Sequence, residues 1–319
     1  MYVESGLSTS DVYNAPIYGR FFYPEGTHMI RTPLGKRFIE ELSIANDQII
    51  YSAFAHHEFD KIAVDQYKKY PQKKTTASFP KNPIAIRLDV TNAELYILRK
   101  TNAQVGHRSG IIAGTEHALA YLQEMQEFRA GDDANKTSSD PKEPEEEKAL
   151  RKLRIWSAAD IEPAWFRTIG YFRLLRNHYA HANRFLHGAF RIHIANYGHY
   201  LNRFWNNGFT VTFGYDFQDE RVNQHDLDHA LAAMNFLRAS IREIDAAFAS
   251  TLRLEHVVER AIQDVWRHSP TLRTDVSKLA RKVRTTLDLQ YGERFPLDCI
   301  LPSVTQMLPN LSKAGSTAP

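Results

Sequence analysis

The side chains best suited to chemistry lie together between Leu175 and His181. This run places an arginine, an amide and two histidines within about two helical turns, as Arg176, Asn177, His178 and His181. Imidazoles exchange protons near neutral pH, and a guanidinium binds phosphate. Cleavage of RNA by its own 2′-hydroxyl needs a base, an acid and a cation that stabilises the charge on phosphorus. The run therefore predicts a metal-independent site for RNA cleavage.

Helical spacing determines which of these groups can meet. Asn177 and His181 are four residues apart and share a face, and His178 also adjoins His181. Arg176 lies about 140° from His181 around an ideal helix, so it joins them only from a helix start or by wrapping its long side chain around. One histidine supplies one proton carrier, whereas two copies related by a two-fold axis supply two. We expect His181 to act as base or acid, Arg176 to clamp phosphate, Asn177 to orient the site and His178 to assist.

The run resembles the signature of HEPN domains, in which histidine follows arginine after four to six positions. Arg176 and His181 fit with four intervening residues, Asn177 fills the usual polar position, and Ala180 precedes the histidine as is common there. The resemblance covers about residues 84–250. It implies an all-α bundle, a homodimer and a metal-independent endoribonuclease without a cofactor. It also implies RNA as substrate and an antitoxin or defence-system partner, because many HEPN proteins act in toxin–antitoxin or phage-defence systems.

Two other functions remain open on the sequence. HEPN domains without catalytic activity bind nucleic acid or proteins, and a partly buried helix with the same residues needs no reaction. Arg173 and His178 even repeat the arginine-to-histidine spacing. A metal-dependent hydrolase is the third hypothesis, because His225 and His229 are four apart and Asp226 lies beside them. Acidic residues at a helix start explain that aspartate without a metal.

Composition narrows the class of protein. The chain has 319 residues, 43% of them hydrophobic, and a net charge of +3, which permits a nucleic-acid partner without requiring one. Its single cysteine, Cys299, excludes an intramolecular disulfide. No apolar run approaches the roughly 20 residues of a membrane span, and the first residues lack a secretory signal. We therefore expect a cytoplasmic protein with no membrane partner.

Hydrophobic periodicity predicts a mostly α protein with a HEPN-like helical bundle, an N-terminal extension and a C-terminal helical appendage. The expected divisions are an N-terminal helical and irregular region over 1–83, the HEPN-like domain over 84–250, and a C-terminal helical region with a tail over 251–319. Within the domain we expect an acidic disordered loop over 129–150, because this stretch is rich in acids and poor in apolar residues.

Helix-starting and helix-stopping residues, together with the spacing of apolar residues, predict the individual elements. One helix is expected to start at Thr32 and Pro33, and a second to run from Gln48 to a stop at Pro71. Later expectations are helical structure over 84–128, a strand hairpin over 209–217, a helix capped by Asn223, helices over 254–267 and 271–289, and a frayed tail from 309.

Overall fold

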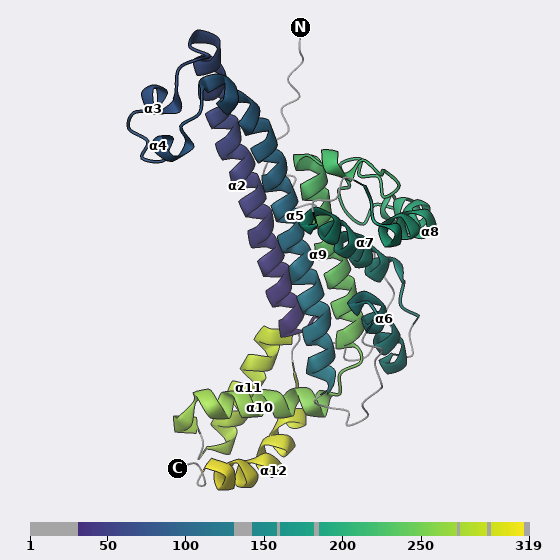
Figure 1. The fold of residues 1–319 in the computed structure, drawn as a ribbon. Coiled ribbons are helices and arrows are strands. Elements are labelled where there is room, and N and C mark those ends of the chain that lie inside the picture. The colour runs from purple at the N-terminus through teal and green to yellow at the C-terminus, as the bar shows by residue number, and fades with distance from the viewer. Residues whose placement is uncertain are drawn as a thin grey trace.

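The computed structural model describes residues 31–130, 142–157, 160–181, 185–272, 275–291 and 295–315. This part is mostly α-helical and contains no β-strand, so the prediction of a mostly α protein is confirmed (Figure 1). The irregular segment expected over 1–30 lies outside the described residues. No helix in the described ranges is both long and apolar enough to cross a bilayer.

Two long antiparallel helices, α2 (Pro33–Lys69) and α5 (Asn92–Ala130), form a hairpin along the molecule (Figure 1). Thr32 caps α2 by accepting a hydrogen bond from the Gly35 N–H, and Pro33 occupies the first turn as expected. The prediction of a separate helix from Gln48 was wrong. No proline or glycine interrupts the chain between 36 and 70, and one buried face continues through the expected break, with Leu42, Ala45 and Ile49.

The two long helices are joined by a short connection that contains α3 (Thr75–Ser78) and α4 (Ala85–Leu88). The helix expected from residue 84 begins only at Asn92, because the backbone turns at Asp89 with a left-handed φ of 36°. The Asn92 amide fastens the turn by donating to the Tyr70 carbonyl at 2.8 Å and to the Ser78 hydroxyl at 3.0 Å.

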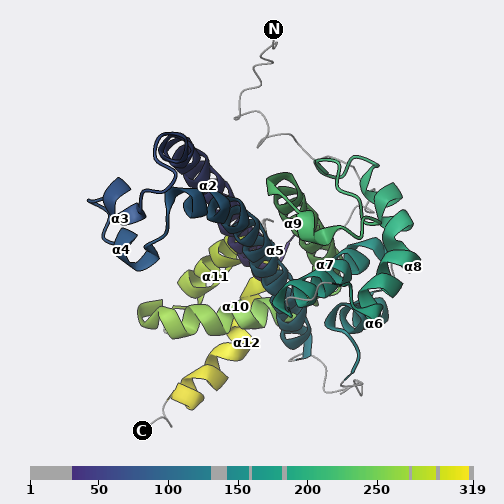
Figure 2. The same ribbon diagram turned by 45° about the horizontal axis from the view of Figure 1, so that its top comes forward.

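The helices that carry the candidate site lie on one side of the hairpin (Figures 1 and 2). They are α6 (Glu145–Trp156), α7 (Ala164–Ala180), α8 (Gly188–Trp205) and α9 (Leu227–Ala249). Helix α9 packs against α2, α5 and α7, and α8 packs against α7. These contacts bury an aromatic core in which Phe172, Trp205 and Phe236 are almost fully enclosed.

Helix α9 starts later than the sequence suggested. Asn223 was expected to be its N-cap, but Val222–Gln224 forms a short 3-10 turn and Asp226 is the cap. Asp226 accepts from the His229 N–H at 3.2 Å, and the His229 ring reaches back to the Asp226 backbone. Buried Val222 anchors the preceding turn, so the chain cannot continue into the helix there.

The expected strand hairpin over 209–217 is also wrong. This segment consists of turns, with positive φ angles at Phe213 (49°) and Gly214 (72°). Phe209 packs edge-on against Trp165, and Phe217 is fully buried. Phe209 and Phe217 therefore pack into the core of the helices, whereas Val211 and Phe213 stay exposed, at 48% and 40%, so the segment does not form one face of a sheet.

The acidic segment is only partly a loop. Residues 131–141 lie outside the described part, but the acids from Glu145 onward open helix α6, where negative charge is favourable. Glu146 is buried and receives three hydrogen-bond contacts of 2.8–3.0 Å from Arg173 on α7. The expectation of disorder up to residue 150 was wrong because composition did not reveal this buried partner.

The C-terminal part forms α10 (Leu254–His268), α11 (Val276–Tyr291) and α12 (Leu297–Gly315), which pack on one another (Figure 1). Helix α10 matches the helix expected over 254–267, whereas α11 begins five residues later than the helix expected over 271–289. The tail expected from 309 is helical as far as Gly315, since α12 is held by buried Ile300 and Val304. Residues 316–319 lie outside the described part.

A buried carboxylate joins the three central helices. Asp245 on α9 is fully buried and accepts hydrogen bonds from the Thr32 N–H at 2.7 Å, the Thr32 hydroxyl at 2.6 Å and the Tyr121 hydroxyl at 3.1 Å. Burial raises the pKa of this carboxyl, although the hydrogen bonds from Thr32 and Tyr121 oppose the shift. One side chain thus connects the start of α2, the last third of α5 and the end of α9.

We expect Asp245→Ala to lower the free energy of unfolding by on the order of 3 kcal/mol, because three buried donors lose their acceptor. Asp245→Asn keeps one acceptor oxygen and should cost less. Urea unfolding followed by circular dichroism measures both, with exposed Asp47→Ala as the control. A loss in Asp245→Ala no larger than in the control would show that the carboxylate does not hold the three helices together.

Candidate active site at the end of helix α7

The predicted run occupies the last turn of α7 and the residue that follows it. Buried Phe172 and Leu175 fix this end of the helix against the core. His181 is the C-cap, and its backbone N–H donates to the Asn177 carbonyl at 3.1 Å. The His181 side chain is exposed. We refer to residues 176–181 as the motif end of α7.

Arg176 and Asn177 form a polar pair at the surface of α5. The Arg176 Nη1 donates to the Asn177 Oδ1 at 2.9 Å, and the Arg176 Nε lies 2.9 Å from a carboxylate oxygen of Glu116 on α5. The Glu116 side chain is about half exposed, at 54%, whereas the Arg176 side chain is 28% exposed and its Nε is buried. Because the carboxylate is half solvated, this ion pair contributes modestly to stability.

His178 lies on a different side of the helix from these groups. It is only 3% exposed, and its Nε2 lies 3.2 Å from the Asn223 Oδ1. Its Nδ1 is buried and has no hydrogen-bond partner among the described residues. His178 and His181 were expected to adjoin, but one ring enters the protein while the other follows the last helical turn into solvent. His178 in this conformation therefore supports the site without reaching its surface.

Three residues outside the predicted set hold the motif end in place. The Tyr179 hydroxyl donates to the Val222 carbonyl at 2.8 Å and lies 2.7 Å from the His225 Nδ1. Arg108 on α5 covers the Tyr179 ring at 5.3 Å and donates to the Asn223 carbonyl. No spacing rule links α5 or the 222–225 turn to α7, so the sequence offered no signal for these contacts beyond the polar character of each residue.

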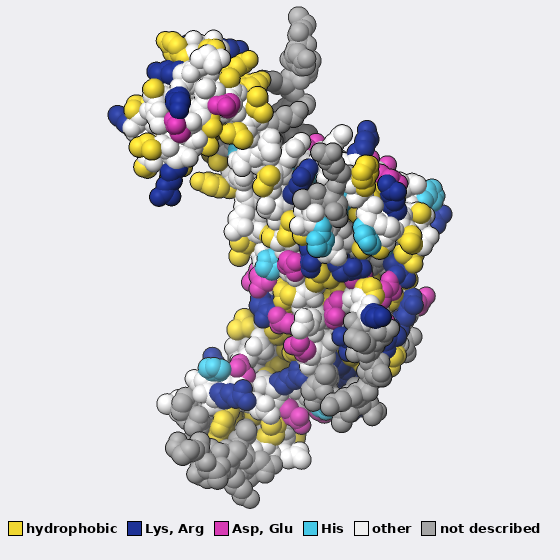
Figure 3. Space-filling view, in the orientation of Figure 1, with side chains coloured by type: hydrophobic (Ala, Val, Ile, Leu, Met, Phe, Trp, Pro, Cys, Tyr) yellow, Lys and Arg dark blue, Asp and Glu magenta, His cyan; other side chains and the backbone are white. Residues whose placement is uncertain are grey.

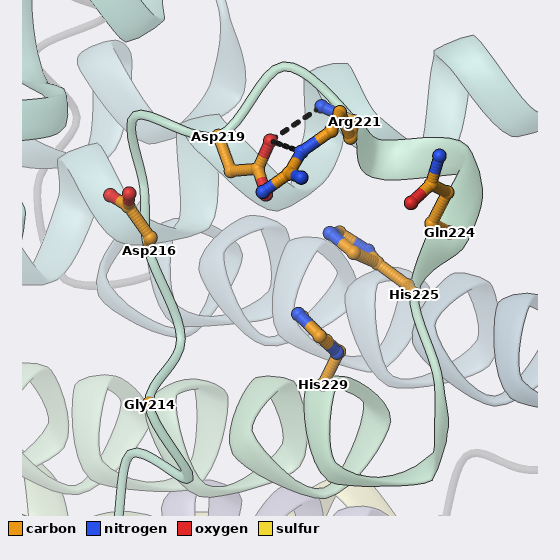
Figure 4. A pocket seen from close by; sticks show the side chains of 7 residues that line it. All are labelled: Gly214, Asp216, Asp219, Arg221, Gln224, His225 and His229. Carbon is orange, nitrogen blue, oxygen red and sulfur yellow. Dashed lines mark hydrogen bonds and ion pairs between the residues drawn. The ribbon is translucent and has the colours of Figure 1, made fainter.

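A polar pocket of about 330 Å³ opens beside the same turn. Figure 4 shows its lining, which consists of Gly214, Asp216, Asp219, Arg221, Gln224, His225 and His229. The two histidine rings stack nearly parallel with centroids 4.7 Å apart. Arg221 is already paired with Asp219 at 2.9 Å, which lowers the pKa of that carboxyl. The pocket therefore presents hydrogen-bonding groups and no unpaired arginine.

The geometry around His225 and His229 does not provide a set of metal ligands. The His225 Nδ1 contacts Tyr179, and the His229 Nδ1 lies 2.6 Å from Asp226, its capping partner. Within the described ranges, no group of three or more histidine, cysteine or acidic side chains is arranged to hold a metal ion. Two stacked histidines without a third ligand do not make a metal centre of ordinary coordination.

Other histidines and basic residues have structural contacts. His187 caps α8, and half-buried His193 hydrogen-bonds the Arg167 carbonyl at 3.0 Å, with burial lowering its pKa to about 4. In the aromatic tract around them, Phe190 and Trp205 lie in the core and are not available to stack bases, whereas Phe185 is 77% exposed. On α11, Lys278 pairs with Asp275.

Neither a protein-family model, nor a curated protein, nor a solved structure matches the chain. The resemblance to HEPN domains therefore depends on the motif and on its helical setting.

His225 gives the site a measurable response to acid. Burial, and secondarily the nearby His229, lower its pKa to about 3, whereas in the unfolded chain it titrates near 6.5. The unfolded state then binds the proton first, so this group's contribution to stability is present above pH ~6.5 and is lost as the pH falls toward 3. We expect His225→Gln to reduce the loss of stability between pH 6 and 4 by about 1 kcal/mol per pH unit.

Urea unfolding at several pH values measures this slope. His199→Gln, which changes an exposed histidine on α8, should leave the slope as in the wild type. An unchanged slope in His225→Gln would show that His225 takes up its proton in the folded state at its ordinary pH.

Proposed function

We propose that the protein is a metal-independent endoribonuclease of the HEPN type that acts as a homodimer. The observation that carries the proposal is the placement of His181, an exposed imidazole at the end of a helix whose last turn presents Arg176 and Asn177 as a hydrogen-bonded pair. A proton carrier and a phosphate-binding cation thus stand on one short segment, and the rest of the segment is anchored in the core.

The reaction requires no co-reactant. A base takes the proton from the ribose 2′-hydroxyl, whose oxygen attacks the adjacent phosphorus, and the bond from phosphorus to the 5′-oxygen breaks. An acid protonates that leaving oxygen, which yields a 2′,3′-cyclic phosphate and a 5′-hydroxyl. One copy of the motif end offers one exposed histidine. Two copies facing each other supply His181 twice, as base and as acid, and Arg176 twice, for the charge on the phosphorane.

The other residues of the motif end act through position. Asn177 holds the guanidinium of Arg176, and Glu116 keeps that guanidinium at the surface until a phosphate replaces the carboxylate. Buried His178 and Tyr179 attach the segment to the 222–225 turn through Asn223 and His225. In this proposal His178 is a positioning residue. A non-catalytic RNA-binding or protein-binding module remains the alternative.

The proposed ribonuclease activity implies a cellular location and a partner. An RNA-cleaving HEPN protein belongs in the cytoplasm as a toxin or a phage-defence effector, and such a protein has an antitoxin or another component of the defence system as partner.

We expect the wild type to cleave RNA in EDTA and His181→Ala to lose at least roughly 100-fold in rate, the contribution of a general acid or base. Arg176→Ala should lose a similar amount. Denaturing gels with end-group analysis of the products measure both. His199→Ala on α8 is the matched control, and equal cleavage by His181→Ala and this control would refute the assignment.

If the site is shared between copies, mixing should show it. After exchange of subunits between wild type and His181→Ala, only wild-type homodimers keep both histidines. The cleavage rate should then fall with the square of the wild-type fraction, whereas sites complete within one copy give a linear fall. Mixtures with His199→Ala should keep the full rate.

A further inference from the structure

The hairpin of α2 and α5 exposes many large apolar side chains. Figure 3 shows hydrophobic side chains gathered over its far end with α3 and α4, and a hollow flank between that end and the C-terminal helices. Among the exposed residues on the two long helices are Ile44 at 59%, Tyr51 at 73%, Ile62 at 51%, Leu98 at 42% and Val105 at 50%. Apolar surface of this extent usually marks a site of association.

Three of these positions, together with the small side chain of Ala55, form a narrow stripe on α2. Ile44, Tyr51, exposed Ala55 and Ile62 are separated by seven, four and seven residues. At about 100° per residue, all four fall within roughly 40° around the helix. Apolar residues in such a stripe are typical of a helix that packs against another helix.

A second stripe runs along α5. Leu98, Val105 and half-buried Ile112 are separated by seven residues each, so they lie almost directly above one another. This stripe is shorter than the one on α2 and likewise consists of apolar side chains on one face of the helix.

Both stripes face away from α9. Gly35 of α2 lies against Asp245, and Gly114 of α5 lies against Met234, so these two positions point toward α9. Gly35 is nine residues before Ile44, and Gly114 is nine residues after Val105. Nine residues are about two and a half turns, which turns a side chain to the opposite side of the helix. The stripes therefore share the face of the hairpin that the described residues leave uncovered.

The two stripes are also symmetric about the same level of the hairpin. On α2, Ile44 and Ile62 each lie nine residues from position 53, and Tyr51 and Ala55 each lie two residues from it. On α5, Leu98 and Ile112 each lie seven residues from Val105. Ser52 lies beside Gly106, and the His56 ring lies 3.4 Å from the Asn102 amide, so position 53 is level with Val105. Two stripes with one common centre fit a two-fold axis at that level, because an isologous interface is self-complementary.

We propose that this face binds a second copy of the chain, with the two hairpins antiparallel and the two-fold axis passing at Val105. Val105 then meets Val105 of the partner subunit, and Leu98 meets Ile112 of the partner subunit. On α2, Ile44 lies opposite Ile62 of the partner subunit, and Tyr51 lies opposite Ala55 of the partner subunit. Neither a bilayer nor a single-stranded RNA has a reason to match a symmetric spacing.

The proposed axis also gives the proposed nuclease its geometry. Arg108, three residues from Val105, contacts the motif end of α7 through Tyr179, and Glu116, eleven residues from Val105, contacts it through Arg176. A two-fold axis at Val105 therefore brings the motif ends of both copies to the same level of the paired hairpins. The inference stands on the two stripes, and it adds to the proposed function the face through which the copies pair.

Disulfide trapping and sedimentation test the face on the full chain. In a Cys299→Ser background, Val105→Cys should cross-link two copies on mild oxidation, because a residue on the axis meets itself within disulfide range. Ile192→Cys, at an equally exposed apolar position on α8, should not. Sedimentation should give a dimer for the wild type, and Val105→Arg should raise the dimer dissociation constant roughly 100-fold or more with helical circular dichroism unchanged. Ile192→Arg should leave the constant as it was.

A monomeric wild type, a dimer that persists in Val105→Arg, or cross-linking by Ile192→Cys alone would each overturn this inference. Loss of vesicle or RNA binding in Val105→Arg without loss of the dimer would do so too. Cleavage of RNA is scored separately. Cross-linking at position 105 without cleavage would leave the interface standing and refute the nuclease, whereas cleavage without this cross-link would refute only the interface.

Discussion

The structure depends on how closely α9 approaches the α2–α5 hairpin. Asp245 supplies the polar part of that contact by accepting from Thr32 and Tyr121 inside the core. Gly35 and Gly114 supply the space, because a side chain at either position would collide with Asp245 or Met234. A buried carboxylate is stable only when its hydrogen bonds are made, so this arrangement fixes the rotation of all three helices.

Fixing that rotation decides which faces remain free. Once Gly35 and Gly114 point toward α9, Ile44 and Val105 point away from it. The hairpin therefore has two apolar faces, one toward α9 and one away from it. One completes the core of the body, and the other stays exposed among the described residues. The same packing places α7 across α5, so the motif end of α7 lies near the middle of the hairpin, by Arg108.

The motif end shows how one short segment serves both structure and chemistry. Its inward residues, His178 and Tyr179, are bound to the turn before α9, and burial keeps the neighbouring His225 neutral down to low pH. Of its outward residues, Arg176 has a hydrogen bond to Asn177 and an ion pair with Glu116, and the His181 side chain has no such contact among the described residues. A rigid support under loosely held polar groups is the arrangement that a phosphate-cleaving site requires.

The sequence by itself determined the helical class, most helix positions and the residues of the motif, because apolar periodicity and helix caps are local properties. It failed where distant partners decided the outcome. Glu146 became helical and buried because Arg173 neutralises it, and Phe217 turned inward because an aromatic core was available. Only the tertiary structure separated His178 from His181 and brought Tyr179, Arg108 and His225 together. It also decided that the stripes on α2 and α5 share one uncovered face, since that depends on where α9 packs and on no property of either helix alone.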